Sequence, residues 1–168
     1  MAELTPQERL QPALLDRLTD EDPAKKLEPR EARLISKGRL RQAVLRDLAW
    51  LFNATRSSDE DIDEAAHPYA AHSVINFGLP ALSGETASTL DAVALEAAIR
   101  QAILDFEPRI MASSLQVEAL VSDLQLDHHN VVSVQIRGSM WAQPVPFDLL
   151  LRTEVDLETG EVQIRDLA

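Results

Sequence analysis

The stretch LEAAIRQAILDFEPRIMASSLQVEALV, residues 95–121, decides the fold, because its apolar pattern changes period at Pro108. Before the proline, apolar residues recur every three or four positions, which predicts a helix over about 91–106 with Asp91 as its N-cap. After it, apolar and polar residues alternate from Leu115 to Val121, as is typical of a half-buried strand. Pro108 ends the helix, because a proline pushes the preceding residue out of the α region.

The alternating pattern continues to the C-terminus. Three more runs show it: residues 132–137, 147–156 and 162–165. Turn residues separate the four runs: 127–130, 143–146 and 158–160. The pattern predicts an antiparallel meander of about four strands, with one apolar face and one solvated face.

Upstream of this sheet the pattern is helical. Ser36 is placed to cap a helix over about 37–53, whose apolar residues recur at spacings of three and four: Leu40, Val44, Leu48, Leu51 and Phe52. Residues 73–80, SVINFGLP, predict a helical turn followed by a buried bend. Helices followed by strands indicate an α+β domain, with the N-terminal helices packed on one face of the C-terminal antiparallel sheet.

Residues 1–33 form a separate N-terminal arm, which four prolines interrupt. Leucines at helical spacing predict a short amphipathic helix over about 8–18. So short a helix must pack on the domain or on a partner. We therefore expect the arm to be partly disordered without a partner, and residues 34–168 to form the domain.

Composition excludes several classes of function. The formal net charge is −12, which disfavours nucleic acid and anionic membranes as partners. The chain has no cysteine, so thiol catalysis, disulfides and Cys-ligated zinc are excluded. The first ten residues lack the apolar core of a secretory signal, and no apolar run approaches a membrane span. We expect a cytoplasmic protein without direct membrane insertion.

Glu107 is the one carboxylate that merits a catalytic hypothesis, because the helix end could project it into a cleft. A glycosidase needs a second carboxylate roughly 5–10 Å away, and Asp105 offers no recognisable pairing. The alternative is a helix-end glutamate paired with Arg109. The histidines do not have the helical spacing of a metal pair: His67, His72, His128 and His129. Nucleotide-binding and nucleophile motifs are missing, so we expect no cofactor, no metal and no catalysis.

Three other side chains are candidates for burial or for protein contact. Arg109 follows a rigid corner, where it suits a cross-subunit salt bridge or, equally, an internal cap of the preceding helix. Trp50 lies within a core-facing helix and is interpreted as core. Trp141 lies at a strand end beside prolines, where we favour burial over an interface role.

Four blocks of sequence together resemble the TssE family of type VI secretion baseplate subunits: residues 39–51, 73–80, 106–110 and 138–146. TssE is similar to a small wedge protein of contractile-phage baseplates, and its superfamily was once called lysozyme-like. The resemblance implies a structural cytoplasmic protein that assembles with TssF, TssG and TssK. It also implies that the sheet templates the first ring of the sheath, which TssB and TssC build.

The resemblance places the family's functional turn, used for contacts in the wedge and in sheath assembly, at Glu107, Pro108 and Arg109. A second Glu-Pro-Arg, at residues 28–30, has no strand after it and is interpreted as coincidence. We further hypothesise that a sheet edge within about 147–166 accepts a partner strand. The outward charges near that edge are Arg152, Glu154 and Arg165. The competing hypotheses are a peptidoglycan hydrolase that uses Glu107 and an unrelated protein-binding adaptor.

Overall fold

A computed structural model describes eight parts of the chain: residues 13–19, 24, 35–57, 62, 65–82, 91–120, 131–142 and 145–167. Three sequence predictions lie outside these residues: the turn at 127–130, the pair His128-His129, and the second Glu-Pro-Arg at 28–30. None of the described helices is both long enough and apolar enough to cross a membrane.

The helices lie close to the predicted positions. They are α1 (Leu14–Leu18), α2 (Lys37–Phe52), α3 (Pro68–Ala71) and α4 (Ala92–Phe106), with 3-10 turns η3 (Val74–Asn76) and η4 (Ala112–Ser114). The predicted N-caps are confirmed, because Ser36 accepts a hydrogen bond from a backbone N–H of α2 and Asp91 accepts two from α4.

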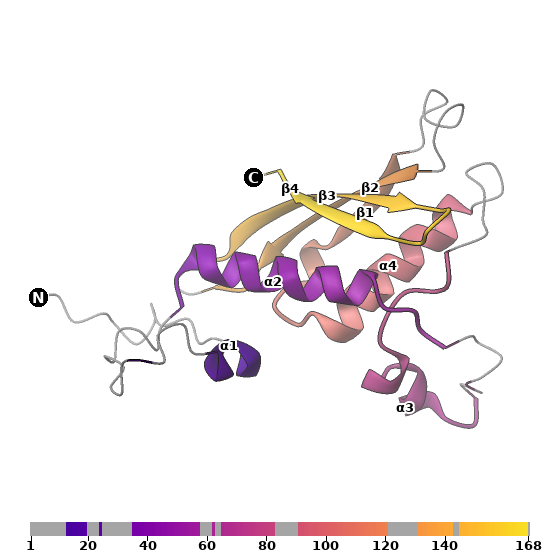
Figure 1. Ribbon diagram of the computed structural model, residues 1–168, viewed down its shortest axis with the longest axis horizontal. Coiled ribbons are helices and arrows are strands. Elements are labelled where there is room, and N and C mark those ends of the chain that lie inside the picture. Colours follow the sequence, from indigo (N-terminus) through magenta and orange to yellow (C-terminus); the bar gives the residue numbers. More distant parts are fainter. Residues whose placement is uncertain are drawn as a thin grey trace, which may run out of the picture.

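The strands form one antiparallel sheet in the order β1-β2-β3-β4. Their bounds are Gln116–Leu120, Val131–Met140, Phe147–Asp156 and Val162–Asp166. Figure 1 shows α2 and α4 on the same face of this sheet. The α+β prediction, with helices on one face of a four-stranded meander, is confirmed.

The core lies between this sheet face and the two long helices. Its fully buried side chains include Val44 and Leu48 of α2, Ile99 of α4, and Val134 and Leu151 of the strands. Each large apolar side chain buried in this way contributes roughly 1.5–3 kcal/mol. The same layer therefore fixes the position of both helix ends relative to the sheet.

A buried bend ties the end of α2 to the segment before α4. Gly78 has a φ of 132°, and a Cβ there would meet the carbonyl oxygen of Ala54 at 2.3 Å. Leu79 donates a hydrogen bond to that same oxygen (2.9 Å) and accepts one from Arg56 (2.9 Å). Only glycine fits this conformation, and the predicted bend is confirmed.

The predicted burial of both tryptophans is wrong, because the Trp50 and Trp141 side chains are each 54 % exposed. Trp50 is two residues from the buried Leu48, which places it on nearly the opposite side of α2. Trp141 lies between the buried Met140 and Ala142, so strand alternation turns it outward. Both positions follow from the local period once the neighbouring buried residues are known.

Helix α1 exposes its leucines. Leu14 and Leu18 are each 73 % exposed, and α1 buries none of its residues. The helix is held from its polar side, where Asp16 forms an ion pair with Arg46 of α2 (2.8 Å). Within residues 13–19 of the arm, this ion pair is thus one contact that ties the arm to the domain.

Candidate protein-interaction site

The Glu-Pro-Arg corner begins where α4 ends. Glu107 is the C-cap of α4, and its N–H donates to the carbonyl of Ile103 (2.8 Å). Pro108 ends the helix, and the N–H of Ile110 then closes a tight turn onto the carbonyl of Glu107 (3.1 Å). Helix end, proline and turn thus form a rigid corner between helix and sheet.

Residues 109–111 pair in antiparallel fashion with the end of strand β2 and the residue after it. Trp141 donates its backbone N–H to the carbonyl of Arg109 (2.7 Å), and Met111 donates to the carbonyl of Ser139 (2.9 Å). Ile110 bridges Met140 between these two bonds. The corner is thereby fixed to the sheet by its main chain as well as to α4.

Glu107 and Arg109 bind each other within the corner. Oε1 of Glu107 accepts hydrogen bonds from Nε of Arg109 (2.6 Å) and from its backbone N–H (3.1 Å), and Oε2 pairs with Nη2. Only 3 % of Glu107 is exposed, against 22 % of the Arg109 side chain. The structure therefore shows the paired arrangement that was the alternative to a catalytic Glu107.

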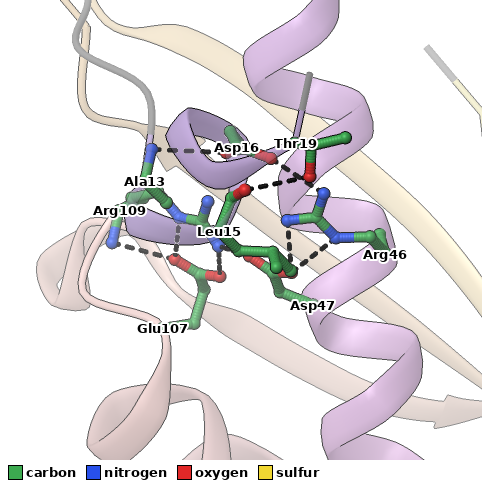
Figure 2. Close-up of polar contacts among 8 residues, drawn as sticks. All are labelled: Ala13, Leu15, Asp16, Thr19, Arg46, Asp47, Glu107 and Arg109. Atoms are coloured by element: carbon green, nitrogen blue, oxygen red, sulfur yellow. Dashed lines mark hydrogen bonds and ion pairs between the residues drawn. The ribbon is translucent and has the colours of Figure 1, made fainter. Parts of the chain in front are cut away.

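The pair extends into a longer series of charges, drawn in Figure 2. Nη2 of Arg109 also donates to Oδ2 of Asp47 on α2 (2.6 Å). Oδ1 of Asp47 accepts from Nε of the adjacent Arg46 (2.9 Å), and Arg46 in turn binds Asp16 of α1 (2.8 Å). We call this series, Asp16–Arg46–Asp47–Arg109–Glu107, the ion-pair chain.

The ion-pair chain holds its arginines charged. Burial by itself would lower the pKa of Arg109, but the hydrogen bonds and charges of Glu107 and then Asp47 outweigh it and raise the pKa above its usual range. Burial also opposes the charge of Arg46, whose pKa is raised by Asp16 and Asp47. Neither arginine releases a proton near neutral pH, so both remain available as charged partners of the carboxylates in the ion-pair chain.

Two features of the corner argue against hydrolysis at Glu107. Both carboxylate oxygens are occupied by Arg109, and the side chain is too buried to meet a sugar polymer.

Within the described ranges, no group of three or more His, Cys, Asp or Glu side chains could hold a metal ion. His72 instead contacts Asp105 of α4 (2.9 Å).

The charged residues predicted near the sheet edge, Arg152, Glu154 and Arg165, lie apart from the corner. Arg152 and Glu154 alternate with buried residues of β3, so they are on the sheet face away from α2 and α4. Arg165 of β4 lies opposite Arg152 and forms an ion pair with Glu154 (Nη2 to Oε2, 3.1 Å). The structure brings these three together but places them on a different surface from Glu107.

Both edges of the described sheet are partly covered by helix side chains. Strand β3 is internal, so β4 is the edge within residues 147–166. The Asn53 amide pairs with both the N–H and the C=O of Val162 (2.9 Å each). At the β1 edge, Glu96 of α4 accepts from the N–H of Ala119 (2.7 Å). Such contacts block one position on each edge against an incoming strand.

Sequence reasoning missed three members of the ion-pair chain: Asp16, Arg46 and Asp47. The helical period places Arg46 and Asp47 off the apolar stripe of α2, where charged residues are usually solvated. The partner of Asp47 lies 62 residues away. The sequence feature that could have indicated Arg46 and Asp47 is their position as an adjacent arginine and acid in a helix that otherwise faces the core.

Comparison with known proteins gives one match. A family model described as "Baseplate wedge protein gp25" matches residues 38–145. The matched region runs from the start of α2 to the connection between β2 and β3, so it contains Asp47 and the Glu-Pro-Arg corner. No curated protein and no solved structure matches the chain significantly.

Proposed function

Because this chain belongs to the family of the baseplate wedge protein gp25, we propose that it is a TssE-type structural wedge subunit of a type VI secretion baseplate. In this role it helps to assemble the cytoplasmic baseplate and starts polymerisation of the contractile sheath. The family match supports a component of a phage-tail-like baseplate. The resemblance of four sequence blocks to TssE supports the secretion role.

The observation that carries this proposal is the ion-pair chain. It joins a turn, a core helix and the N-terminal arm at one point. Removal of Arg109 would leave the buried carboxylate of Glu107 without its partner, which is destabilising, so this clamp resists deformation. A corner fixed in this way suits an assembly contact, because little entropy is lost when it binds.

The proposed partners follow from the same assignment. TssF, TssG and TssK would contact the corner that Glu107, Pro108 and Arg109 form, with Glu107 holding Arg109 in place. TssB and TssC would contact the sheet near Arg152, Glu154 and Arg165. The two surfaces lie on different parts of the fold. A subunit with two separate surfaces can hold the wedge with one and receive the sheath with the other.

The two surfaces can be tested against each other. We would co-express the tagged chain with TssF, TssG and TssK, and measure which subunits co-purify. The first variant is Glu107→Ala/Arg109→Ala, and the matched control is Glu154→Ala/Arg165→Ala, which removes the other acid–arginine pair. Circular dichroism melts would establish that both variants fold.

We expect the corner variant to lose wedge subunits and the control variant to keep them. Fluorescently labelled TssB would then report on sheath growth, which we expect the control variant to impair. A wild-type chain that co-purifies with none of the three subunits would overturn the proposed function. Equal retention by both variants would remove the corner from the wedge contact.

A further inference from the structure

The outer face of the sheet, away from α2 and α4, carries three arginines. They are Arg137 of β2, Arg152 of β3 and Arg165 of β4, and Figure 1 shows no described helix on this side of the sheet. Arg165 lies directly opposite Arg152, and Arg137 lies opposite Leu150, the next outward residue of β3. Like charges in such neighbouring positions repel each other, so each arginine needs an acceptor.

Two of the three arginines have an acceptor within the sheet. Arg165 forms an ion pair with Glu154 (Nη2 to Oε2, 3.1 Å), and Arg137 donates from Nη2 to Oε1 of Gln135 (2.9 Å). The same two acceptors are the nearest polar neighbours of Arg152, because Gln135 lies opposite it and Glu154 is two residues further along β3. Both acceptors are therefore engaged by the flanking arginines.

Arg152 is left without an acceptor. It has no hydrogen bond or ion pair with the part of the chain that the structure describes, and its Nε is buried and unbonded. The residue as a whole is partly exposed, so a partner can reach it. A cation that is partly withdrawn from water without an acceptor is unfavourable, and a carboxylate that binds it recovers this cost.

The other acids of the outer face do not contact Arg152. Glu118 of β1 lies on the far side of Gln135, and Asp148 and Asp156 are each four residues from Arg152 along β3. With the usual strand spacing and rise, these backbones are roughly 10–14 Å from that of Arg152. An acceptor for Arg152 therefore has to come from outside the described strands.

Apolar surface borders Arg152 on one side. Leu150 is two residues before it on the same face of β3 and is partly exposed. The N–H of Leu167 donates to the carbonyl of Leu150 (2.9 Å), and Leu167 is 50 % exposed. A carboxylate bound beside such apolar surface is screened less by water, and a central arginine in this setting is typical of an interface hot spot.

We propose that Arg152 anchors the outer face of the sheet to a sheath subunit by binding an aspartate or glutamate side chain of that subunit. The inference rests on the proposed function, which assigns TssB and TssC to this surface, and it adds the chemistry of the contact. Arg152 makes the central contact. Glu154 and Arg165, which already bind each other, form its polar border.

The chain offers a matched pair of variants for the test. Arg152→Met removes the charge and keeps most of the apolar stem. Arg137→Met is the control, because Arg137 lies on the same face, carries the same charge and already has an acceptor in Gln135. The probe is the co-expressed TssB–TssC complex, titrated against the full-length wild type and both variants. We expect Arg152→Met to weaken binding at least about tenfold, and Arg137→Met less than about threefold.

Thermal melts distinguish an anchor from a residue that supports the fold. Because Arg152 has no acceptor in the described chain, the Tm of Arg152→Met should equal or exceed that of wild type. A clear fall in Tm would show that the arginine stabilises the domain itself, and would overturn its assignment as an anchor.

The binding outcomes separate this inference from the function on which it rests. If the wild-type chain fails to bind the TssB–TssC complex, the sheath role and the inference both fall. If wild type binds and Arg152→Met binds equally well, only the anchor is wrong. Equal loss in both variants would also overturn a dedicated anchor, because it would show a general effect of positive charge.

A crosslinking variant tests whether the partner group is a carboxylate. Arg152→Lys keeps the charge and introduces an amine, which a carbodiimide joins to a touching carboxylate as an amide while the carbodiimide takes up the water. Mass spectrometry should then find this position coupled to an Asp or Glu of TssB or TssC, with wild type as the uncoupled control. Coupling only to acids of this chain, such as Glu154, or to a second copy of it, would overturn the proposal.

Discussion

Asp47 of α2 and Arg109 of the corner are 62 residues apart in sequence and share a 2.6 Å hydrogen bond between Oδ2 and Nη2. Arg46 binds the other oxygen of the same carboxylate. One carboxylate thus links the two arginines of the ion-pair chain. The corner is therefore bonded to helix α2 through Asp47 and to helix α4 through the Glu107 N–H.

Asp47→Ala should destabilise the domain by about 2 kcal/mol, because it removes bonds from two charged arginines. For a chain of this length that corresponds to a fall in Tm of roughly 4–8 °C. Asp148→Ala, which removes an exposed carboxylate, is the control and should change the unfolding free energy by less than about 0.5 kcal/mol. Urea unfolding measures both. Equal effects would show that Asp47 does not support the corner.

Gly78→Ala should be strongly destabilising, because the new Cβ would overlap the Ala54 carbonyl in a backbone conformation with positive φ. We expect a loss of at least about 2 kcal/mol. Gly38→Ala is the matched control: nothing lies within 4 Å of its Cβ, and α2 should gain about 0.5–1 kcal/mol. Thermal melts of both variants would check this, and a neutral Gly78→Ala would contradict the buried bend.

The turn between β3 and β4 should make stability depend on pH. Backbone N–H groups, first that of Thr159 and then that of Glu158, hold the pKa of Asp156 below its usual value. A lowered pKa means that the ionised carboxylate stabilises the fold above its unfolded pKa of about 4, and that this contribution disappears as pH falls through the folded pKa. Urea unfolding of wild type and Asp156→Ala should therefore differ at pH 7 and converge in acid. A constant difference would exclude this linkage.

The regular elements were predictable because each depends on a local period. The helices at 37–53 and 91–106 and the four strands were found to within a few residues. Strand β2 runs three residues further than predicted, to Met140, because Gly138 interrupts the alternation. A Cβ at Gly138 would meet Ile110 at 3.3 Å, so the glycine makes room for the corner.

The ion-pair chain was not predictable, because its bonds join residues that no period relates. Glu107 and Arg109 were identified by resemblance, and their mutual pairing was anticipated from their spacing. Asp47 is marked in the sequence only by its place beside Arg46 in a core-facing helix, and its role depends on how α2 crosses the corner. Likewise the outward position of Trp141 depends on which neighbours the core buries.

Asn53→Ala should weaken the edge of the sheet, because it exposes both backbone groups of Val162 that the amide now covers. We expect a loss of about 1–3 kcal/mol from the two lost hydrogen bonds, together with concentration-dependent self-association through the uncovered β4 edge. Asn53→Asp is the informative companion, since it keeps the acceptor for the Val162 N–H and removes the donor. Sedimentation velocity at several concentrations, with urea unfolding, measures both effects. If Asn53→Ala stays monomeric and as stable as wild type, the amide does not protect this edge.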